Sequence, residues 1–409
     1  MTASRVWAGG QEPFIRRVAY RGLLVVVFTI QWDGVVQIGG LGTLNRLLGL
    51  ALLPVAGAAI VLDGQRNSWR DVHAVALAFS GWVIASALWT VNASQTADRS
   101  FRVVQVLGLL LLVWEFADTP RRFRNLVLAY VSGGGVLIVT AIWTYLRGTT
   151  GARFQLGNIH PNDIAFLLAI TVVLSWWVSF HVDTALQRTL LRCMVPAALF
   201  ATVLTASRSG LFTSAIAVLI VPATAGALSR AGRRRLIVAL IVLAPIVPTV
   251  LPAEQLLRLS TTAGEISEGN LNDRRDFWTI GIEMFESEPL RGVGAGGSRQ
   301  RLSESVLGRN AGLHNTYLSV AAELGVVGLG LFLLLVLAAV SQGWTTRIVE
   351  RRALVVLTIV TMIGLFPRHW EYEKSLWFIL AVLAGIGRFG GQLNRLAASE
   401  EAARSPSAT

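Results

Sequence analysis

The sequence predicts an all-α membrane protein that crosses the bilayer about twelve times, and two observations support that prediction. Of its 409 residues, 53% are hydrophobic and only 15% are charged, which is too apolar for a soluble protein of this length. The apolar residues also gather into runs of about 20 residues, the length of a helix that spans the hydrocarbon core. Lipid cannot satisfy backbone N–H and C=O groups, so these runs are expected to be helical.

The apolar runs follow one another along the chain with mostly short polar loops between them. Basic residues precede the first run and no small-residue cleavage site follows it, so we expect an uncleaved first span. Asp33 and the pair Gly39-Gly40 break the first two runs. The expected spans lie near 18–37, 42–62, 71–90, 96–116, 124–147, 162–180, 189–206, 210–228, 235–252, 313–341, 352–368 and 375–391.

The distribution of arginine predicts the orientation of the chain. A net charge of +12 in a soluble protein would suggest a nucleic-acid partner, but the inner loops of membrane proteins collect Arg and Lys. Alternate loops here are rich in arginine. We therefore expect a multi-pass protein of the cytoplasmic membrane, with both termini in the cytoplasm and no nucleic-acid partner. The single cysteine, Cys193, excludes an intrachain disulfide.

One polar stretch is much longer than the other loops, and the predicted orientation places it at the outer face. It divides the chain into N-terminal membrane helices (1–252), a large outer loop (253–312), C-terminal membrane helices (313–391) and a cytoplasmic tail (392–409). Loops of this length are usually functional or disordered. Apolar residues recur with a helical period over 274–287, which predicts a short helix that Pro289 stops.

Polar and ionisable residues gather where the long loop meets the next apolar run. His314 lies in Gly312-Leu313-His314-Asn315-Thr316-Tyr317-Leu318, and Glu323, Gly325 and Gly328 follow it. Upstream stand Arg274-Arg275-Asp276-Phe277-Trp278 and then Pro289-Leu290-Arg291-Gly292-Val293-Gly294. As a set, these elements resemble the signature region of the O-antigen ligase family, which also includes O-antigen and exopolysaccharide polymerases.

The resemblance implies a membrane glycosyltransferase of the C class (GT-C-like) that uses no metal and no cofactor. Such an enzyme moves a glycan from a polyprenyl diphosphate to a hydroxyl of a glycan or lipid acceptor, within reach of membrane lipid. The motifs serve both ligases, which transfer a finished glycan, and polymerases, which extend a growing chain. We favour the ligase-type interpretation and keep the polymerase as its alternative.

The resemblance also implies roles for individual residues. Arg208, in Ser207-Arg208-Ser209-Gly210, matches the family's Ser-Arg element. The cations expected at the diphosphate are Arg208, Arg275 or its neighbour Arg274, and Arg102. His314 would be the catalytic base, because a neutral imidazole can take the proton of a sugar hydroxyl. Substrate or acceptor contacts are expected from Trp278, Asn315, Tyr317, Glu323 and Asn162.

Each of these residues also has a purely structural interpretation. Arg208 and Arg102 could anchor helix ends at the membrane interface. Asn315 and Asn162 could cap helices. Glu323, which falls inside an apolar run, needs a partner and could pair with an arginine such as Arg208.

Other functions fit the sequence less well. We find no Walker-type phosphate loop and no Asp-x-Asp pair, the patterns expected of nucleotide-dependent enzymes. A transporter for lipid-linked sugars would place its site near the middle of the membrane, whereas the polar cluster here lies on one side. A peptidoglycan glycosyltransferase of the shape-and-division type would be expected to carry a prominent loop carboxylate and not this His-Asn pattern.

Overall fold

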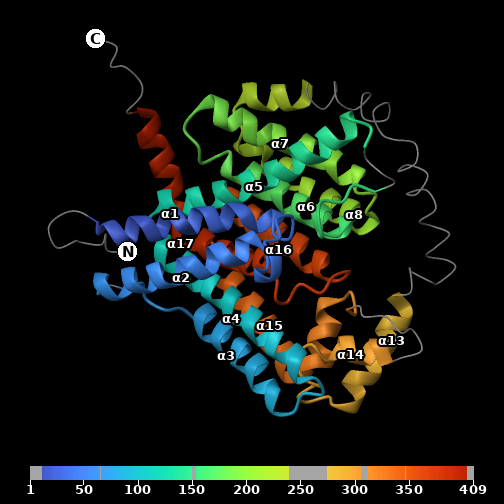
Figure 1. The fold of residues 1–409 in the computed structure, drawn as a ribbon. Helices are drawn as coiled ribbons and strands as arrows, with labels where there is room; N and C mark the ends of the chain where they lie inside the picture. Colours follow the sequence, from blue (N-terminus) through green and yellow to red (C-terminus); the bar gives the residue numbers. More distant parts are fainter. Residues whose placement is uncertain are drawn as a thin grey trace, which may run out of the picture.

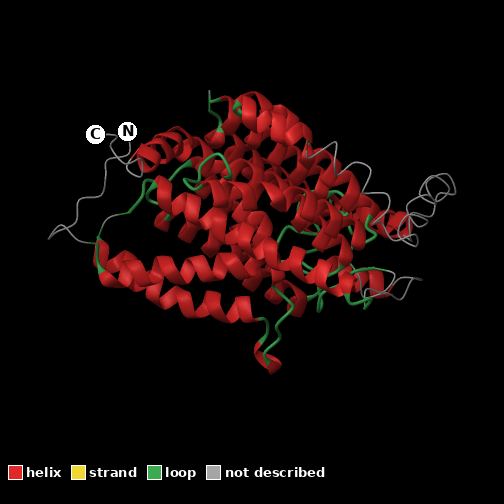
Figure 2. Cartoon of the chain, turned by 90° about the horizontal axis from the view of Figure 1, so that it is seen from above, coloured by secondary structure: helices red, strands yellow, loops and turns green. Residues whose placement is uncertain are grey.

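The computed structural model describes residues 12–64, 66–149, 153–238, 274–304, 312–345 and 347–402, and every named element in these ranges is helical (Figures 1 and 2). The α-helices are α1 (Phe14–Thr29), α2 (Leu44–Asp63), α3 (Asp71–Ala85), α4 (Ala93–Phe116), α5 (Pro120–Leu146), α6 (Pro161–Val178), α7 (Ala185–Leu204), α8 (Arg208–Val218), α9 (Ile220–Thr224), α13 (Arg274–Ser287), α14 (Gly297–Glu304), α15 (Thr316–Gly343), α16 (Ile348–Leu365) and α17 (Lys374–Ala402).

Seven helices in the described part of the chain are long and apolar enough to cross a membrane. They are Leu44–Asp63, Asp71–Leu88, Pro120–Leu146, Pro161–Val178, Arg208–Ala227, Thr316–Gly343 and Lys374–Leu393. The predicted all-α membrane fold is therefore confirmed, whereas the count of about twelve spans is not. Four further expected spans form helices that are short, as α1 is, or charged, as α4, α7 and α16 are. The expected span near 235–252 lies mostly outside the described residues.

Two helices form the centre of the bundle. α6 packs against α5, α7, α8 and α16, and almost every residue from Ile164 to Val178 is buried. α17 packs against α4, α5 and α15. A helix that is hydrophobic all round is expected in such a buried position, and α6 has no polar face.

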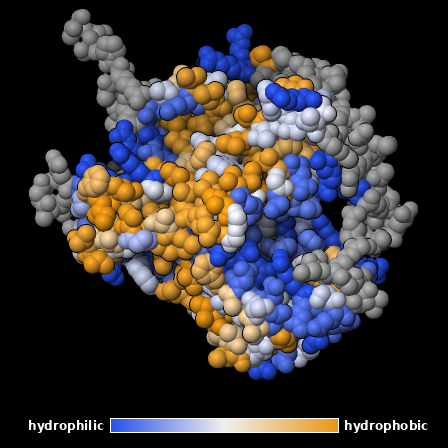
Figure 3. Space-filling view, viewed as in Figure 1, coloured by the Kyte–Doolittle hydropathy of each residue, from blue (hydrophilic) through white to orange (hydrophobic). Residues whose placement is uncertain are grey.

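One end of the bundle collects the residues that the sequence singles out. The helices α6, α8 and α15 begin there, and a loop formed by residues 366–373 joins α16 to α17 at the same end. α13 and α14 cover part of this end (Figure 1). Figure 3 shows hydrophilic side chains gathered over these two helices and hydrophobic ones over α1 and α2.

The helix predicted over 274–287 is confirmed as α13 (Arg274–Ser287). Its buried face, with Phe277 and Met284, packs with Leu313 and Ala322 in a small second core. Of the predicted outer loop, the structure describes only residues 274–304 and Gly312. At the other end of the chain, α17 continues to Ala402, so the first part of the predicted tail is helical.

Candidate active site

The backbone of His314 is held in a conformation that few residues adopt. His314 has φ 50°, in the left-handed region, and among the described residues other than glycine only Ala206 shares that region. Asn315 caps α15, because its side chain accepts a hydrogen bond from the Leu318 N–H at 3.1 Å. The indole N–H of Trp278 donates to the Leu313 carbonyl at 3.1 Å. The histidine is thus fixed from both sides, as strained residues at functional sites usually are.

The second left-handed residue, Ala206, turns the chain into α8. Arg208 is the first residue of that helix, and Ser207 caps it by accepting from the Gly210 N–H at 3.1 Å. A Cβ at Gly210 would lie 2.2 Å from the Cβ of Ala165, so only glycine lets α8 approach α6 this closely. Both signature motifs therefore stand at helix N-termini, where the helix dipole favours an anion.

The N-terminus of α6 is bound to the loop 366–373. Asp163 accepts a hydrogen bond from the Trp370 indole at 2.9 Å and forms an ion pair with Arg368 at 3.4 Å. Arg368 also donates to the backbone carbonyl of Asn162. The Asn162 side chain accepts from Arg153 at 2.9 Å. The side-chain oxygen of Asn162 is therefore already engaged by the protein.

His369, in the same loop, lies beside His314. The centres of the two imidazole rings are 5.4 Å apart, and the ring planes are inclined at 65° in an edge-to-face contact. A Cβ at Gly312 would lie 3.0 Å from the His369 ring, so the glycine before the motif makes room for this contact. Burial, together with the charge of His314 and nearby arginines, lowers the pKa of His369 to about 3. Both rings are therefore neutral at physiological pH.

The electrostatic surroundings of His314 favour its neutral form. Burial, together with the smaller effects of the Arg274 and His160 charges and against the opposing charge of Asp163, lowers its pKa to about 4. Burial is the largest cause of this shift in the pKa of His314, ahead of the nearby charges. A neutral imidazole has a free lone pair, as a general base requires.

The two adjacent arginines of α13 differ in their surroundings. Burial lowers the pKa of Arg274, and its charge acts on His314, His160 and Arg368. Arg275 is exposed. The charge of Arg274 therefore reaches the histidine, whereas Arg275 is exposed to solvent.

Three other residues expected at the substrate already have protein partners. Trp278 packs edge-on against Phe366 with ring centres 5.5 Å apart, in addition to its bond to the Leu313 carbonyl. The Tyr317 hydroxyl donates to the Met362 carbonyl at 2.7 Å, on α16. Asn315 is buried as the cap of α15. These side chains hold the His314 loop in place.

Glu323 binds residues 292–298, which are rich in glycine. No arginine among the described residues lies within ion-pair distance of its carboxylate. One oxygen accepts from the Gly296 N–H at 2.7 Å and the other from the Ser298 hydroxyl at 2.5 Å. The carboxylate is buried, and the sequence alone could not identify these two donors as its partners. Glu323 therefore fixes the loop that connects α13 to α14.

The same loop depends on a break in α15. Gly325 has φ 69° and ψ −171°, which interrupts the helix. The carbonyls that the break releases accept from Val293, Gly294 and the Trp82 indole at 2.9–3.1 Å. A Cβ at Gly325 would lie 2.2 Å from the Leu290 carbonyl oxygen. The motif glycines thus have a conformational and packing role.

Arg102 lies apart from the other predicted cations. It is exposed and pairs with Asp98 at 2.9 Å. It lines a polar cavity together with Tyr372, Glu373 and Lys374, at the end of the loop 366–373 beyond His369. The structure therefore brings Arg274 and Asn162 to the surroundings of His314, and places Arg102 in a separate cavity.

Two residues of the site were missed in the sequence, Arg368 and His369. The signal was present, because Arg368-His369-Trp370-Glu371 is a polar run between two apolar ones. Such a run at a helix end has the same character as the His314 motif. The described residues contain no group of three or more His, Cys, Asp or Glu side chains that could hold a metal ion.

The comparison with known families agrees with this arrangement. The model of the family described as O-antigen ligase matches residues 193–333, a segment that contains Arg208, Arg274 and His314. A search of the curated proteins finds no match. The motifs named above stand together within this matched segment, so residues 193–333 are similar to the O-antigen ligase family.

Proposed function

We propose that the protein transfers a glycan from a polyprenyl diphosphate to an acceptor hydroxyl at the outer face of the cytoplasmic membrane. The observation that supports this most directly is a neutral, largely buried His314 with the charge of Arg274 acting on it, at the N-terminal ends of α6 and α15. A base beside a cation is what attack on a diphosphate-activated sugar needs.

The donor diphosphate would bind at the Arg274 side of the histidine. Burial disfavours the charged form of Arg274, so a bound anion would relieve an existing cost. Arg208, at the first turn of α8, would add a second cation. The N-termini of α6 and α8 supply further positive potential. Arg368 forms an ion pair with Asp163 and donates to two backbone carbonyls, so we assign it the role of holding the loop 366–373 in position.

The reaction would proceed by displacement at the anomeric carbon. The acceptor oxygen forms the new bond, and the bond between that carbon and the diphosphate oxygen breaks with its electron pair leaving on the diphosphate. His314 takes the proton of the acceptor hydroxyl. Attack from the side opposite the leaving group inverts the anomeric configuration. Arg274 and Arg208 stabilise the charge that develops on the diphosphate.

Donor binding would also strengthen the base. A pKa of about 4 describes His314 with cations nearby and no anion bound. A diphosphate placed among these cations brings negative charge close to the imidazole and raises its pKa. The histidine therefore becomes a stronger base only when the leaving group is in place.

We favour the ligase-type reaction, in which a finished glycan is moved to a different acceptor, over polymerisation. The polar groups of the site stand at helix ends, which fits transfer at a membrane surface better than transport through the middle of the bilayer. The Arg274, Arg208 and helix-dipole charges supply the stabilisation of the leaving group without a metal ion, so we expect activity to resist chelators.

The test is to incubate the purified protein in detergent with a polyprenyl diphosphate oligosaccharide and an acceptor, with and without chelator, and to size the products. A single product on the acceptor supports the ligase, and a ladder supports the polymerase. We expect His314→Ala to abolish transfer in both cases while the protein keeps its thermal unfolding midpoint. Wild-type activity in folded His314→Ala protein would overturn the mechanism.

A further inference from the structure

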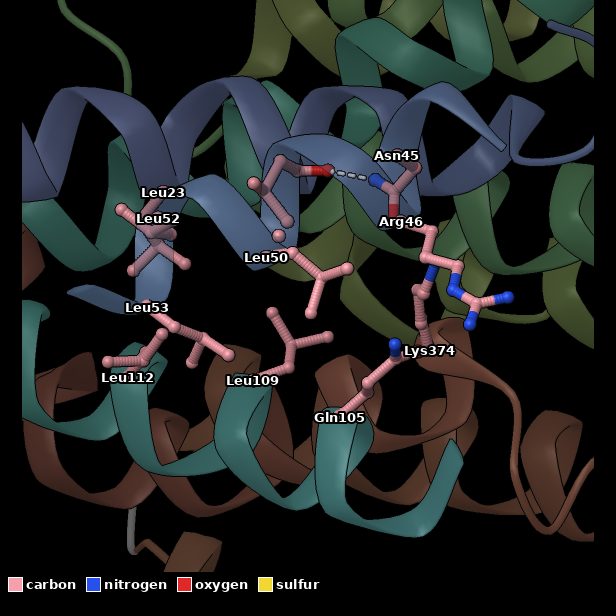
Figure 4. A pocket seen from close by; sticks show the side chains of 12 residues that line it. Leu23, Asn45, Arg46, Leu50, Leu52, Leu53, Gln105, Leu109, Leu112 and Lys374 are labelled. Carbon is pink, nitrogen blue, oxygen red and sulfur yellow. Dashed lines mark hydrogen bonds between the residues drawn. The ribbon is translucent and has the colours of Figure 1, made fainter. Parts of the chain in front are cut away.

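An apolar groove runs between α1, α2 and α4 and opens at one end into the polar cavity that Arg102 lines (Figure 4). We call these the leucine groove and the head cavity. The leucine groove is lined by Leu23 of α1, Leu50 and Leu53 of α2, and Leu109 and Leu112 of α4. Arg46, Gln105 and Lys374 line both spaces and mark the junction between them.

The two spaces differ in size. The leucine groove has a cavity volume of about 50 Å³, and the head cavity, at about 270 Å³, is close to the lower end of the range of pockets that bind small molecules. From Gln105 to Leu112 the groove follows α4 for two turns, or about 10 Å at ~1.5 Å per residue. Figure 4 shows the leucines along this stretch and the polar side chains together at one end.

Hydrogen-bond donors at the junction have no acceptor among the described residues. The Nε atom of Arg46 and the amide nitrogen of Gln105 are both buried and unpaired there. A buried donor without an acceptor destabilises the folded protein, because it has lost its hydrogen bonds to water. Two such donors at the polar end of an apolar groove indicate a ligand with acceptor oxygens on its head and a hydrocarbon tail.

The charged residues that line the head cavity balance in number, and Arg46 differs from the other two cations in having no carboxylate partner among the described residues. Lys374 pairs with Asp33 at 2.6 Å, and Arg102 pairs with Asp98 at 2.9 Å. The guanidinium of Arg46 lies 4.8 Å from the ring centre of Phe101 and forms no ion pair in the described part of the chain. Glu373, the remaining carboxylate of the cavity, is exposed to solvent. Arg46 is thus the cation whose charge a ligand can neutralise.

The head cavity lies next to the candidate active site without being part of it. The loop 366–373 carries His369, which contacts His314, while Tyr372 and Glu373 at its end line the cavity. The charge of Arg102 reaches His369 and lowers its pKa. A lipid bound here would therefore present its head beside the histidine pair, away from the Arg274 side.

We propose that the leucine groove and the head cavity bind the lipid that carries the acceptor. One hydrocarbon chain of this lipid lies along the leucines, and its phosphate is held by Arg46, Gln105 and Lys374. This inference rests on the proposed function, because transfer between two lipid-linked substrates needs two separate anionic sites. The groove between α1, α2 and α4 is narrow, which fits a single-chain polyprenyl phosphate better than a lipid with several acyl chains. The inference therefore belongs to the polymerase-type alternative of the proposed function, in which the growing chain stays on such a carrier.

Two glycines of α2 offer a matched pair of variants. A Cβ at Gly49, which lines the leucine groove, meets no atom within 4 Å, and the same holds for Gly57, which lies outside the groove. Gly49→Leu therefore places a side chain in the groove from a position where its Cβ meets no neighbour, and Gly57→Leu is its control in the same helix. For the head cavity, Arg46→Gln is compared with Arg147→Gln, at the end of α5.

The binding test uses the full-length protein in detergent, titrated with polyprenyl monophosphate in competition with phosphatidylglycerol and analysed by native mass spectrometry. We expect the wild type to retain two polyprenyl phosphates, one at the Arg274 side and one in the groove. Gly49→Leu and Arg46→Gln should each weaken one site by about tenfold, which corresponds to ~1.4 kcal/mol. Equal retention by Gly49→Leu and Gly57→Leu, or displacement by phosphatidylglycerol at equal concentration, would overturn the proposal.

The kinetic test separates the two substrates. Arg46→Gln and Gly49→Leu should raise the KM for a lipid-linked acceptor by about tenfold and leave kcat and the KM for the donor unchanged. A rise in the donor KM alone would assign the groove to the donor and overturn the proposal. If the wild type transfers no glycan and its lipid binding still depends on Arg46, the proposed function fails while the lipid site stands.

Discussion

The two neighbouring arginines of α13 allow a sharp test of the candidate site. Arg274 is half-buried and its charge lowers the pKa of His314, whereas Arg275 is exposed. The perturbation is Arg274→Gln, with Arg275→Gln as the matched control one residue away. Both changes remove one positive charge from the same first turn of the same helix, so their effect on net charge and on helix propensity is equal.

The expected magnitude follows from the surroundings of each residue. A hydrogen bond from a charged donor to an anion contributes about 1.5–3 kcal/mol, which is about 10- to 150-fold in kcat/KM at ~1.36 kcal/mol per decade. Arg274→Gln should lower kcat/KM by a factor in that range. Arg275→Gln should stay within about twofold, since surface substitutions usually change free energies by less than ~0.5 kcal/mol.

The assay measures consumption of a polyprenyl diphosphate oligosaccharide at a fixed acceptor concentration, over a range of pH. Arg274→Gln should also move the acidic limb of the kcat/KM profile to higher pH, because removing a nearby positive charge raises the pKa of His314. A merely structural role of Arg274 would not move that limb. A large loss in Arg275→Gln with activity retained in Arg274→Gln would refute the assignment.

Two further predictions concern the histidine and the break in α15. For the wild type, kcat/KM should be flat from pH 8 to about pH 5 and fall below pH 4. His314 has a pKa of about 4 in the free enzyme, and the imidazole cannot accept a proton once it is charged. An acidic limb near pH 6.5 would contradict the effect of burial on this pKa. Gly325→Ala should lower the thermal unfolding midpoint sharply, since its Cβ would lie 2.2 Å from the Leu290 carbonyl oxygen. A Cβ at Gly330, on the same helix, meets no atom within 4 Å, so Gly330→Ala should raise the unfolding free energy by about 0.5–1 kcal/mol. Equal unfolding midpoints in the two variants would contradict the close packing of Gly325 against Leu290.

The fold class could be predicted from the sequence because it depends on composition along short stretches. A run of about 20 apolar residues forms a helix in lipid whatever its neighbours are. The number of spans could not be predicted in the same way. The N-terminal half of α4 carries Asp98, Arg99 and Arg102, and polar residues of this kind are acceptable only where other helices pair or cover them. That condition depends on packing.

The candidate site was partly predictable because its motif is local. His314 and Asn315 stand directly before a helix, and the cap that Asn315 forms needs only the next three residues. The choice between Arg274 and Arg275 could not be made from spacing, because it depends on which face of α13 packs against α15. The role of Glu323 was also hidden, because its donors, Gly296 and Ser298, reach it only through the break at Gly325.

By itself, the sequence determined that this chain is a helical membrane protein and that a His-Asn motif with upstream arginines stands at a helix start. Both are properties of neighbouring residues, read from hydropathy, capping and motif spacing. Only the tertiary structure decided that His369 lies against His314 and that Arg46 joins Lys374 at the mouth of the leucine groove. These residues are far apart in the chain, and antiparallel helix packing brings them to one end of the bundle.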